Sequence, residues 1–393
     1  MTDREDVVNV LAHPTAARGI SRRAFLAGAT VTVAGSSVLI SACGGGSDEP
    51  STGASAAPSG ELEDQINMFT WGEYDYPKVM KQFTAEYGPT IELSSYNSNE
   101  EMISKLIATE GTSGFDIVVP TGVFIPQMAE NDLLVPLDLA RIPNFENIAE
   151  EYRNQPWDPD NAHSVPKAWG TTGYAYQKNL VTRPMETWQD FIDAAMNEAS
   201  GNMSILDDPN EAIGLYFWSK DEDWNTEDPA LLDECEDFLV NELAPHVKAF
   251  ESYPGSNGIP QGSYALSQAW NGDARQGILA DKTGNWEWTF PSPRSELWMD
   301  NWCIPTGAPN PNAAYAWINS NLDQEVSLQT LSWVGYNTGV SGIEPAAKEA
   351  GIERLDMVFF TAEQVGTMDA GEVNQSQQRR VEIFNNMKAA AVG

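Results

Sequence analysis

The fold is decided by residues 65–119, which read QINMFTWGEYDYPKVMKQFTAEYGPTIELSSYNSNEEMISKLIATEGTSGFDIVV. Apolar residues gather in 65–71, alternate with polar ones in 90–96, and form a short continuous run in 115–119. These patterns predict three strands, the last of them buried on both faces. We therefore expect them to form the core sheet of a first α/β unit.

Two helical patterns separate these strands. Residues 77–87 have a proline in the opening turn, and Ser98-Asn-Glu-Glu101 is a capping box in front of a buried helical stripe. A β-α-β-α-β order predicts a parallel sheet with helical crossovers, and a further helix is expected over 122–131. Ligands bind such sheets beyond the carboxyl ends of the strands. Residues 71–74 and Thr121 both lie there, because each follows a strand.

A second α/β unit is expected to begin near Thr171. Its predicted elements are a helix opening at 187–191, a strand at 203–206, a helix beginning at Asp208, and strands at 264–270 and 298–304. Asp208-Pro-Asn-Glu211 has two interpretations. The two acids can act only as a helix N-cap and its capping-box partner, or they can bind a ligand.

Four stretches at the ends of these elements combine aromatic rings and carboxylates. They are Trp71-Gly-Glu73-Tyr74, Asp208-Pro-Asn-Glu211, Trp270-Asn-Gly-Asp273 and Trp298-Met-Asp300, the second of which supplies acids alone. A ring face attracts an ammonium group, and a carboxylate adds a charge-assisted hydrogen bond to the same nitrogen. If the fold brings these stretches together, they make a site for an organic cation.

The N-terminus has the order of features typical of an exported lipoprotein. A twin-arginine pattern at 21–26 is followed by a mildly apolar run and by Ile40-Ser-Ala-Cys43, which resembles a bacterial lipobox. We expect residues 1–42 to be a signal peptide, Cys43 to carry lipid, and residues 43–60, rich in Gly and Ser, to be a flexible tether. The alternative is a membrane anchor that is never cleaved.

Charge and motif content exclude several classes of function. The net charge of −35 argues against binding nucleic acid and favours the approach of cations, although an acidic surface is also typical of an extracellular or salty setting. No P-loop, dinucleotide fingerprint or nucleophile elbow occurs, and His163 and His246 have no neighbours at metal-ligand spacing. We therefore expect no metal, no cofactor and no catalytic residues. Cys235 and Cys303 are expected to be unpaired, partly buried thiols.

From about Asn67 to Lys388 the chain resembles the spermidine/putrescine-binding proteins of bacterial ABC importers. The resemblance rests on seven motifs in family order: Trp71-x-Glu-Tyr, Asp116-Ile-Val-Val-Pro-Thr121, Pro166-x-x-Trp169-Gly170, Leu206-Asp-Asp-x-x-Glu211, Trp270-Asn-Gly, Trp298-Met-Asp300 and Gly335-Tyr336. It implies a two-domain α/β "flytrap" fold, the type II periplasmic-binding-protein fold, with hinge crossings near Thr171, Asp300 and Glu344. The lobes would comprise 61–171 with 301–344, and 172–300 with 345–393.

The resemblance also implies a ligand-binding set in the cleft between the lobes. This set is Trp71, Glu73, Tyr74, Thr121, Asp208, Glu211, Trp270, Asp273, Trp298, Asp300 and Tyr336. The rings would hold the methylene chain of a polyamine. Asp208 and Glu211 would hold a terminal amine, and Asp300 an inner or neighbouring nitrogen.

The chain departs from the family pattern at two places. Val123 stands where spermidine binders have an aromatic residue, with Phe124 as a substitute, and only Gln375 or Gln377 could supply the family's C-terminal glutamine. Asp273 resembles the putrescine-preferring branch, whereas Trp298-Met-Asp300 resembles the spermidine-preferring one. The length of the ligand therefore stays open.

These observations lead to one main hypothesis and two alternatives. The first is a monomeric, exported lipoprotein in the periplasm or on the outer cell surface, which captures polyamines and delivers them to an ABC permease. The second is a solute-binding protein for a sugar or another organic amine. The third, more remote, is a glycosidase that pairs Asp208 with Glu211 or Asp300 as acid and base.

Overall fold

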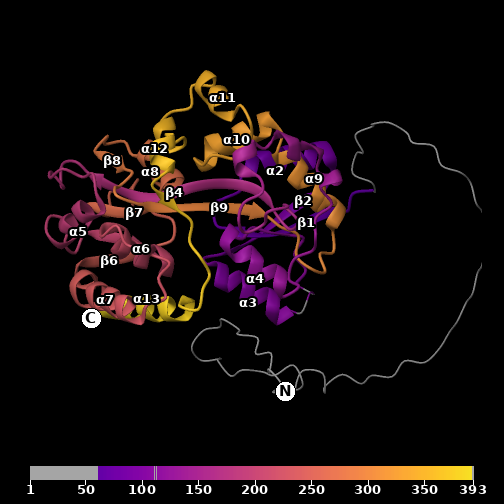
Figure 1. The fold of residues 1–393 in the computed structure, drawn as a ribbon. Coiled ribbons are helices and arrows are strands. Elements are labelled where there is room, and N and C mark those ends of the chain that lie inside the picture. Colours follow the sequence, from indigo (N-terminus) through magenta and orange to yellow (C-terminus); the bar gives the residue numbers. More distant parts are fainter. Residues whose placement is uncertain (1–60, 110, 112, 392–393) are drawn as a thin grey trace, which may run out of the picture. The chain divides into compact units, whose positions relative to one another are not determined.

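The first sheet has three parallel strands in the order β2-β1-β3, as predicted (Figure 1). β1 (Gln65–Trp71) and β2 (Thr90–Tyr96) have the predicted bounds, but β3 (Ile117–Val118) is shorter than expected. Apolar side chains of β1 enter two different clusters: Ile66 and Met68 one, and Phe69 the other. The sheet is therefore packed on both faces.

The computed structural model describes residues 61–109, 111 and 113–391. The predicted signal peptide, the lipid on Cys43 and the tether 43–60 lie outside the described residues. The residues that are described belong to one compact unit.

Helices cover the two faces of the first sheet. α2 (Pro77–Tyr87) has its predicted bounds and packs with α9 (Pro311–Asn321) on one face, while α3 (Asn99–Thr109) and α4 (Ile125–Glu130) lie on the other (Figure 1). The helix predicted over 122–131 is α4 preceded by one 3₁₀ turn.

The capping box at the start of α3 is present only in part. The Ser98 hydroxyl accepts a hydrogen bond from the Glu101 amide at 3.2 Å. The Glu101 carboxylate, however, accepts from the amide of Asn97 at 3.0 Å rather than from that of Ser98. In a complete capping box the acid would accept from the amide of the N-cap residue, here Ser98, so this pairing is shifted by one residue.

The second sheet is mixed rather than purely parallel. Its order is β10-β9-β4-β7-β5-β6, with β8 also paired to β4. β5 is parallel to both β6 and β7, whereas β4 is antiparallel to β7, β8 and β9. The strands are β4 (Val165–Gln177), β5 (Met203–Leu206), β6 (Val247–Glu251), β7 (Leu266–Trp270), β8 (Trp286–Thr289), β9 (Ser295–Trp302) and β10 (Met368–Asp369). β7 begins two residues later than predicted, and β9 begins three residues earlier and ends two earlier.

Two long strands connect the sheets. β4 and β9 run side by side across the middle of the described structure (Figure 1). Beyond the end of β9, Cys303 exchanges two backbone hydrogen bonds of 2.9 Å with Val118 of β3. Thr171, where we expected the second unit to begin, lies in the middle of β4.

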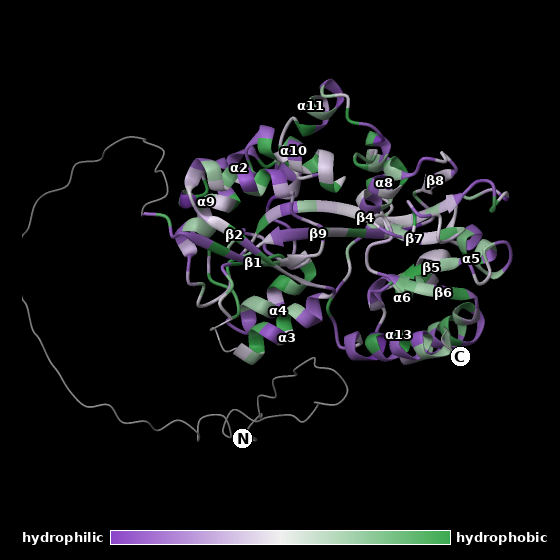
Figure 2. Ribbon diagram, turned by 180° about the vertical axis from the view of Figure 1, so that it is seen from behind, coloured by the Kyte–Doolittle hydropathy of each residue, from purple (hydrophilic) through white to green (hydrophobic). Residues whose placement is uncertain are grey.

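The remaining helices pack either on the second sheet or beside the first. Figure 2 shows that hydrophobic residues dominate α6, whose residues Glu211 to Trp218 are all buried. α5, α6, α7 and α13 contribute to one apolar core with β5. The bounds are α5 (Trp188–Met196), α6 (Pro209–Ser219), α7 (Pro229–Asp237), α8 (Asn271–Ala280), α9 (Pro311–Asn321), α10 (Gln324–Val334), α11 (Ile343–Glu349), α12 (Ala362–Val365) and α13 (Gln377–Ala391).

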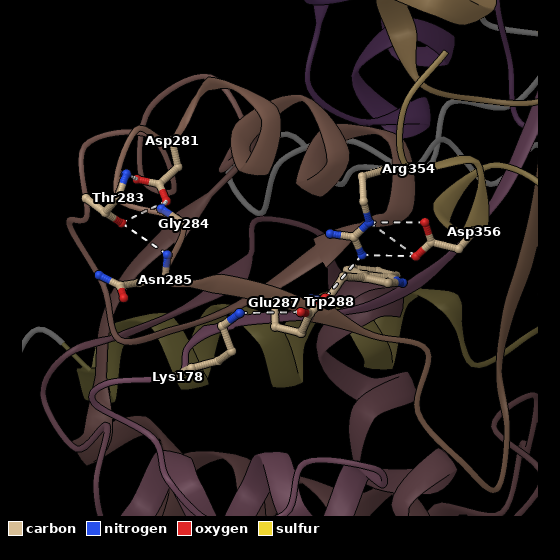
Figure 3. Close-up of polar contacts among 9 residues, drawn as sticks. All are labelled: Lys178, Asp281, Thr283, Gly284, Asn285, Glu287, Trp288, Arg354 and Asp356. Carbon is tan, nitrogen blue, oxygen red and sulfur yellow. Dashed lines mark hydrogen bonds and ion pairs between the residues drawn. The ribbon is translucent and has the colours of Figure 1, made fainter. Parts of the chain in front are cut away.

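After α11 the chain lies against β8 and α8. Arg354 forms ion pairs with Asp356 at 3.0 Å and with Glu287 of β8 at 3.2 Å (Figure 3). The side-chain amide of Asn271 donates to the Met357 carbonyl at 2.7 Å. These contacts hold residues 354–357 to the second sheet.

Cys235 and Cys303 are both free thiols, as expected, but they are fully rather than partly buried. Burial raises the pKa of both thiols. Within the described part of the chain, no group of acids, histidines and cysteines is arranged to hold a metal ion. Nor does a helix of that part have the length and apolar character needed to cross a membrane.

Candidate functional site

All eleven residues of the predicted set line one cavity that is partly open to solvent. They come from the end of β1 and the loop after it, the segment after β3, the start of α6, the junction of β7 and α8, β9, and the turn after α10. The fold thus brings the four scattered stretches together. That they bind a ligand remains a prediction.

Aromatic rings form one wall of the cavity. Tyr74 and Tyr336 meet edge to face with ring centroids 5.8 Å apart, and Tyr336 meets Trp298 in the same way at 4.8 Å. The indole of Trp71 is held by a 3.0 Å hydrogen bond to the Val119 carbonyl. Such rings offer π faces and apolar surface for a methylene chain with cationic ends.

Asp300 lies beside this wall, 7% exposed. It accepts a 2.8 Å hydrogen bond from the Thr121 hydroxyl, which in turn accepts one from the Asn99 side-chain amide at 3.1 Å. Burial raises the pKa of Asp300 to about 6, although hydrogen bonds from Thr121 and Tyr74 and the positive charge of Lys167 oppose the shift. At pH 7 the carboxyl group is therefore mostly ionised at a cost in stability, which a nearby cation would offset.

Asp208 is an N-cap, as one interpretation predicted. Its carboxylate accepts hydrogen bonds from the amides of Asn210 at 2.8 Å and Glu211 at 3.3 Å. It also lines the cavity, so the capping role does not exclude a binding role. Burial and the negative charges of Glu211 and Glu100 raise the pKa of Asp208 to about 8.

The interpretation of Glu211 as only a capping-box partner is wrong. Its Oε1 atom accepts hydrogen bonds from the Thr172 hydroxyl at 2.7 Å and from the Trp270 indole at 2.5 Å. The first turn of α6 thus aims this acid across to β4 and β7 rather than back at its own N-cap. Glu211 is 2% exposed, and burial raises its pKa.

Asp273 is held in the cavity wall by the backbone. Its carboxylate accepts a 2.7 Å hydrogen bond from the Gly255 amide, and its own amide donates to the Tyr336 hydroxyl at 3.2 Å. Burial raises the pKa of Asp273 to about 7 despite the Gly255 bond. A Cβ atom at Gly272 would lie 2.5 Å from the Tyr336 ring, which explains the glycine of the Trp270-Asn-Gly-Asp273 stretch.

Segments from the two sheets meet over the cavity. The Gly72 amide donates to the Tyr253 hydroxyl at 3.0 Å, and the Ser256 hydroxyl donates to the Glu73 carboxylate. These contacts join the loop after β1 to the segment that follows β6. They close part of the cavity rim.

The two departures from the family pattern have different outcomes. Val123 and Phe124 both line the cavity, so the proposed substitution stays open. Neither Gln375 nor Gln377 lines the cavity. The side-chain amide of Gln377 donates to Glu100 at 2.9 Å, and the backbone amide of Gln375 donates to Glu227 at 2.8 Å.

Sequence reasoning missed several lining residues, and for Glu296 a signal existed. Glu296, Trp298 and Asp300 alternate along β9, and a strand places alternate residues on one face. Tyr253 and Arg380 gave no such signal, because their own segments carry no recognisable motif. The Arg380 guanidinium is buried and already donates to Ser376 at 2.9 Å and to two backbone carbonyls.

Comparison with known proteins gives this site a context. The profile of the bacterial extracellular solute-binding protein family matches residues 78–353. The spermidine/putrescine-binding periplasmic protein 1 of Haemophilus influenzae is 29% identical over 81% of this chain and 86% of its own. The corresponding protein of Salmonella typhimurium is 30% identical over 73% of this chain and 80% of its own.

A solved structure agrees with the sequence relatives. The spermidine/putrescine ABC transporter substrate-binding protein of Streptococcus pneumoniae superposes with a TM-score of 0.69 at 30% identity, covering 84% of this chain and all of the other. The expected two-domain periplasmic-binding-protein fold is confirmed. With a profile that spans most of its length and relatives that align over four fifths of theirs, this chain belongs to the family of bacterial extracellular solute-binding proteins.

Proposed function

We propose that this protein captures a linear polyamine, such as putrescine or spermidine, in the cavity and delivers it to an ABC permease. The observation that carries the proposal is the lining of the cavity. Seven carboxylates line it together with a single basic residue, Arg380, and its apolar surface comes largely from Trp and Tyr rings. The relatives named above, which are spermidine/putrescine-binding proteins, support the same ligand class.

The arrangement suits a chain with separated positive charges. Asp208 and Glu211 belong to the start of α6, Asp300 to β9, and Asp273 to α8. A micromolar affinity requires about −8 kcal/mol. Three charge-assisted hydrogen bonds near the upper end of roughly 1.5–3 kcal/mol each, with several ring contacts of up to about 2 kcal/mol each, reach this value after an association cost of about 4 kcal/mol.

Ligand release requires the lobes to separate, and β4 and β9 would serve as hinge strands in this motion. We place the hinges near Thr171 of β4, near Asp300 of β9 and near Glu344 of α11, with lobes of 61–171 plus 301–344 and 172–300 plus 345–393. The pairing of β4 with β9 in the second sheet, and the bridge of Asp300 to Thr121 after β3, support the first two positions. A ligand that bridges the lobes would favour the closed arrangement.

In this proposal the mature chain is a monomer tethered through lipid on Cys43 to the outer face of a membrane. It performs no chemistry on its ligand. The family and its named relatives are transport proteins, which supports this part.

Isothermal titration calorimetry of the mature domain with putrescine, spermidine, spermine and several sugars tests the proposal. We expect micromolar or tighter binding of at least one amine and none of sugars. Binding of sugars alone would select the second hypothesis. Recovery of the ligand unchanged after overnight incubation separates a binding protein from a glycosidase.

A further inference from the structure

Glu296 is the one cavity residue on the Trp298 and Asp300 face of β9 that the resemblance gives no role. It lies two residues before Trp298 and four before Asp300 and is half-buried at the cavity wall. Its carboxyl group faces that of Glu211 within hydrogen-bonding reach. β9 and α6 thus place two carboxyl groups opposite each other.

Glu211 has an acceptor atom with no donor. Thr172 and Trp270 both donate to Oε1, whereas Oε2 is buried and has no hydrogen-bond partner among the described residues. Leaving a buried charged acceptor unpaired is unfavourable. Two ionised carboxylates cannot donate to each other. Two ionised carboxylates in contact also repel each other, so this pair is stable when one group carries a proton or when a cation lies between them.

The surroundings do not supply that cation. No ion pair within the described part of the chain includes Glu211 or Glu296, and Arg380 is bonded elsewhere. The charged groups that act on Glu296 are all acids: Glu211 and Asp208 from α6, and Asp300 from β9 itself. Burial and the negative charge of Glu211 raise the pKa of Glu296 well above its ordinary range. With no cation between them, the contact of the two carboxyl groups favours one shared proton.

We propose that Glu296 is a specificity-determining residue that shares one proton with Glu211 in the empty cleft and exchanges it for a protonated nitrogen of the ligand. One positive charge leaves to solvent and one enters, so the charge of the site is unchanged. No covalent bond other than the carboxylic O–H is broken. A neutral hydroxyl group brings no charge and cannot replace the proton, so the pair selects cations over sugars. This inference rests on the proposed function.

The isosteric variant Glu296→Gln tests the exchange. The amide group that it introduces donates permanently to Oε2 of Glu211 and has no proton to release. Calorimetry of the mature domain with spermidine, in two buffers of different ionisation enthalpy, counts the protons released on binding. We expect the count to fall by about one relative to the wild type. We also expect the affinity of the wild type to rise more steeply with pH than that of the variant. The difference should be up to tenfold per pH unit, which is the linkage value for one proton.

Glu92→Gln provides a matched control, because Glu92 is an exposed glutamate on strand β2. It should leave the proton count and the affinity unchanged. Thermal unfolding of each variant checks that the fold is intact, and Glu211→Gln provides a second test, since removing either partner should remove the same proton. A Glu296→Gln protein that releases as many protons as the wild type would overturn the proposal.

An infrared measurement separates this inference from the proposed function. In the empty protein at pH 7, the protonated-carboxyl stretching band should be weaker in Glu296→Gln than in Glu92→Gln by one group. If the wild type binds no amine, the proposed function fails while this comparison still decides whether the pair shares a proton. Equal bands in the two variants would refute the shared proton whatever the ligand is.

Discussion

Replacing Asp300 by asparagine should change affinity and stability in opposite directions. Asparagine keeps an oxygen that can accept from Thr121 but loses the negative charge that would hold an ammonium group. A hydrogen bond to a charged partner contributes about 1.5–3 kcal/mol. At 1.4 kcal/mol per factor of ten, we expect the affinity for spermidine and putrescine to fall roughly ten- to a hundredfold.

The effect on the empty protein follows from the burial of Asp300. Its pKa rises from the ordinary 3.8 to about 6, and one pKa unit corresponds to about 1.4 kcal/mol, so ionised Asp300 lowers the free energy of unfolding by about 3 kcal/mol at pH 7. Asparagine removes this cost but makes weaker hydrogen bonds, which reduces the gain in stability by about 1 kcal/mol. The empty variant should therefore unfold a few degrees higher than the wild type.

The difference in stability between Asp300→Asn and the wild type should depend on pH. The folded state favours the protonated form of Asp300, so the wild type loses stability as the pH rises from 4 through about 6. The advantage of Asp300→Asn should be full at pH 7 and vanish near pH 4. Calorimetric titration and thermal unfolding measure both effects, and Asp160→Asn, at an exposed aspartate, is the control. Unchanged affinity together with lowered stability would show that Asp300 only positions Thr121.

Three further predictions concern the rim, the wall and the acids of the cavity. Tyr253→Phe removes the acceptor for the Gly72 amide, and with it one hydrogen bond of about 1 kcal/mol. Stopped-flow fluorescence should therefore show that the ligand dissociates several-fold faster. An unchanged rate would mean that this contact does not hold the cleft closed. Gly272→Ala places a methyl group 2.5 Å from the Tyr336 ring. Denaturant unfolding should show that the free energy of unfolding falls by about 1–3 kcal/mol, and calorimetry should show weaker ligand binding. Wild-type values in both measurements would contradict the packing of Gly272 against Tyr336. Finally, protons compete with the ligand for carboxyl groups such as Asp208, whose pKa is about 8, so amine affinity should fall from pH 8 to pH 5, and a pH-independent affinity would argue against ionised acids in the site.

The local elements of this fold were predictable because their signals are local. β1, β2 and α2 have the predicted bounds, since each shows its periodicity within one short segment and Pro77 marks a helix start. β4 was not predicted as a strand, although it is the longest of those described. It contains Pro166 and two glycines, and its burial comes from partners in β7 and β9 that lie roughly 90 to 140 residues away in the chain. Such pairing leaves no mark in the strand's own sequence.

The candidate site shows the same division in its individual residues. Rings and acids that sit in motifs at strand ends could be found, because a parallel sheet brings those ends to one edge. Glu296 could have been found too, by extending the alternation of Trp298 and Asp300 one step back along β9. Tyr253 could not, because only the meeting of two segments from different sheets brings its hydroxyl to Gly72.

The stability cost of the acids in the cavity wall is itself an argument for a cationic ligand. Asp208, Glu211, Asp273, Glu296 and Asp300 all have raised pKa values in the folded protein, so each ionised form lowers the stability of the empty cleft. Apolar residues would fold better here, because replacing buried charges by apolar groups often stabilises a protein. Retaining five such groups around one ring-lined cavity is physically reasonable if a polycation compensates them on binding. The same groups then make binding a proton exchange, in which affinity rises with pH because the ligand and the proton compete for the same oxygen atoms.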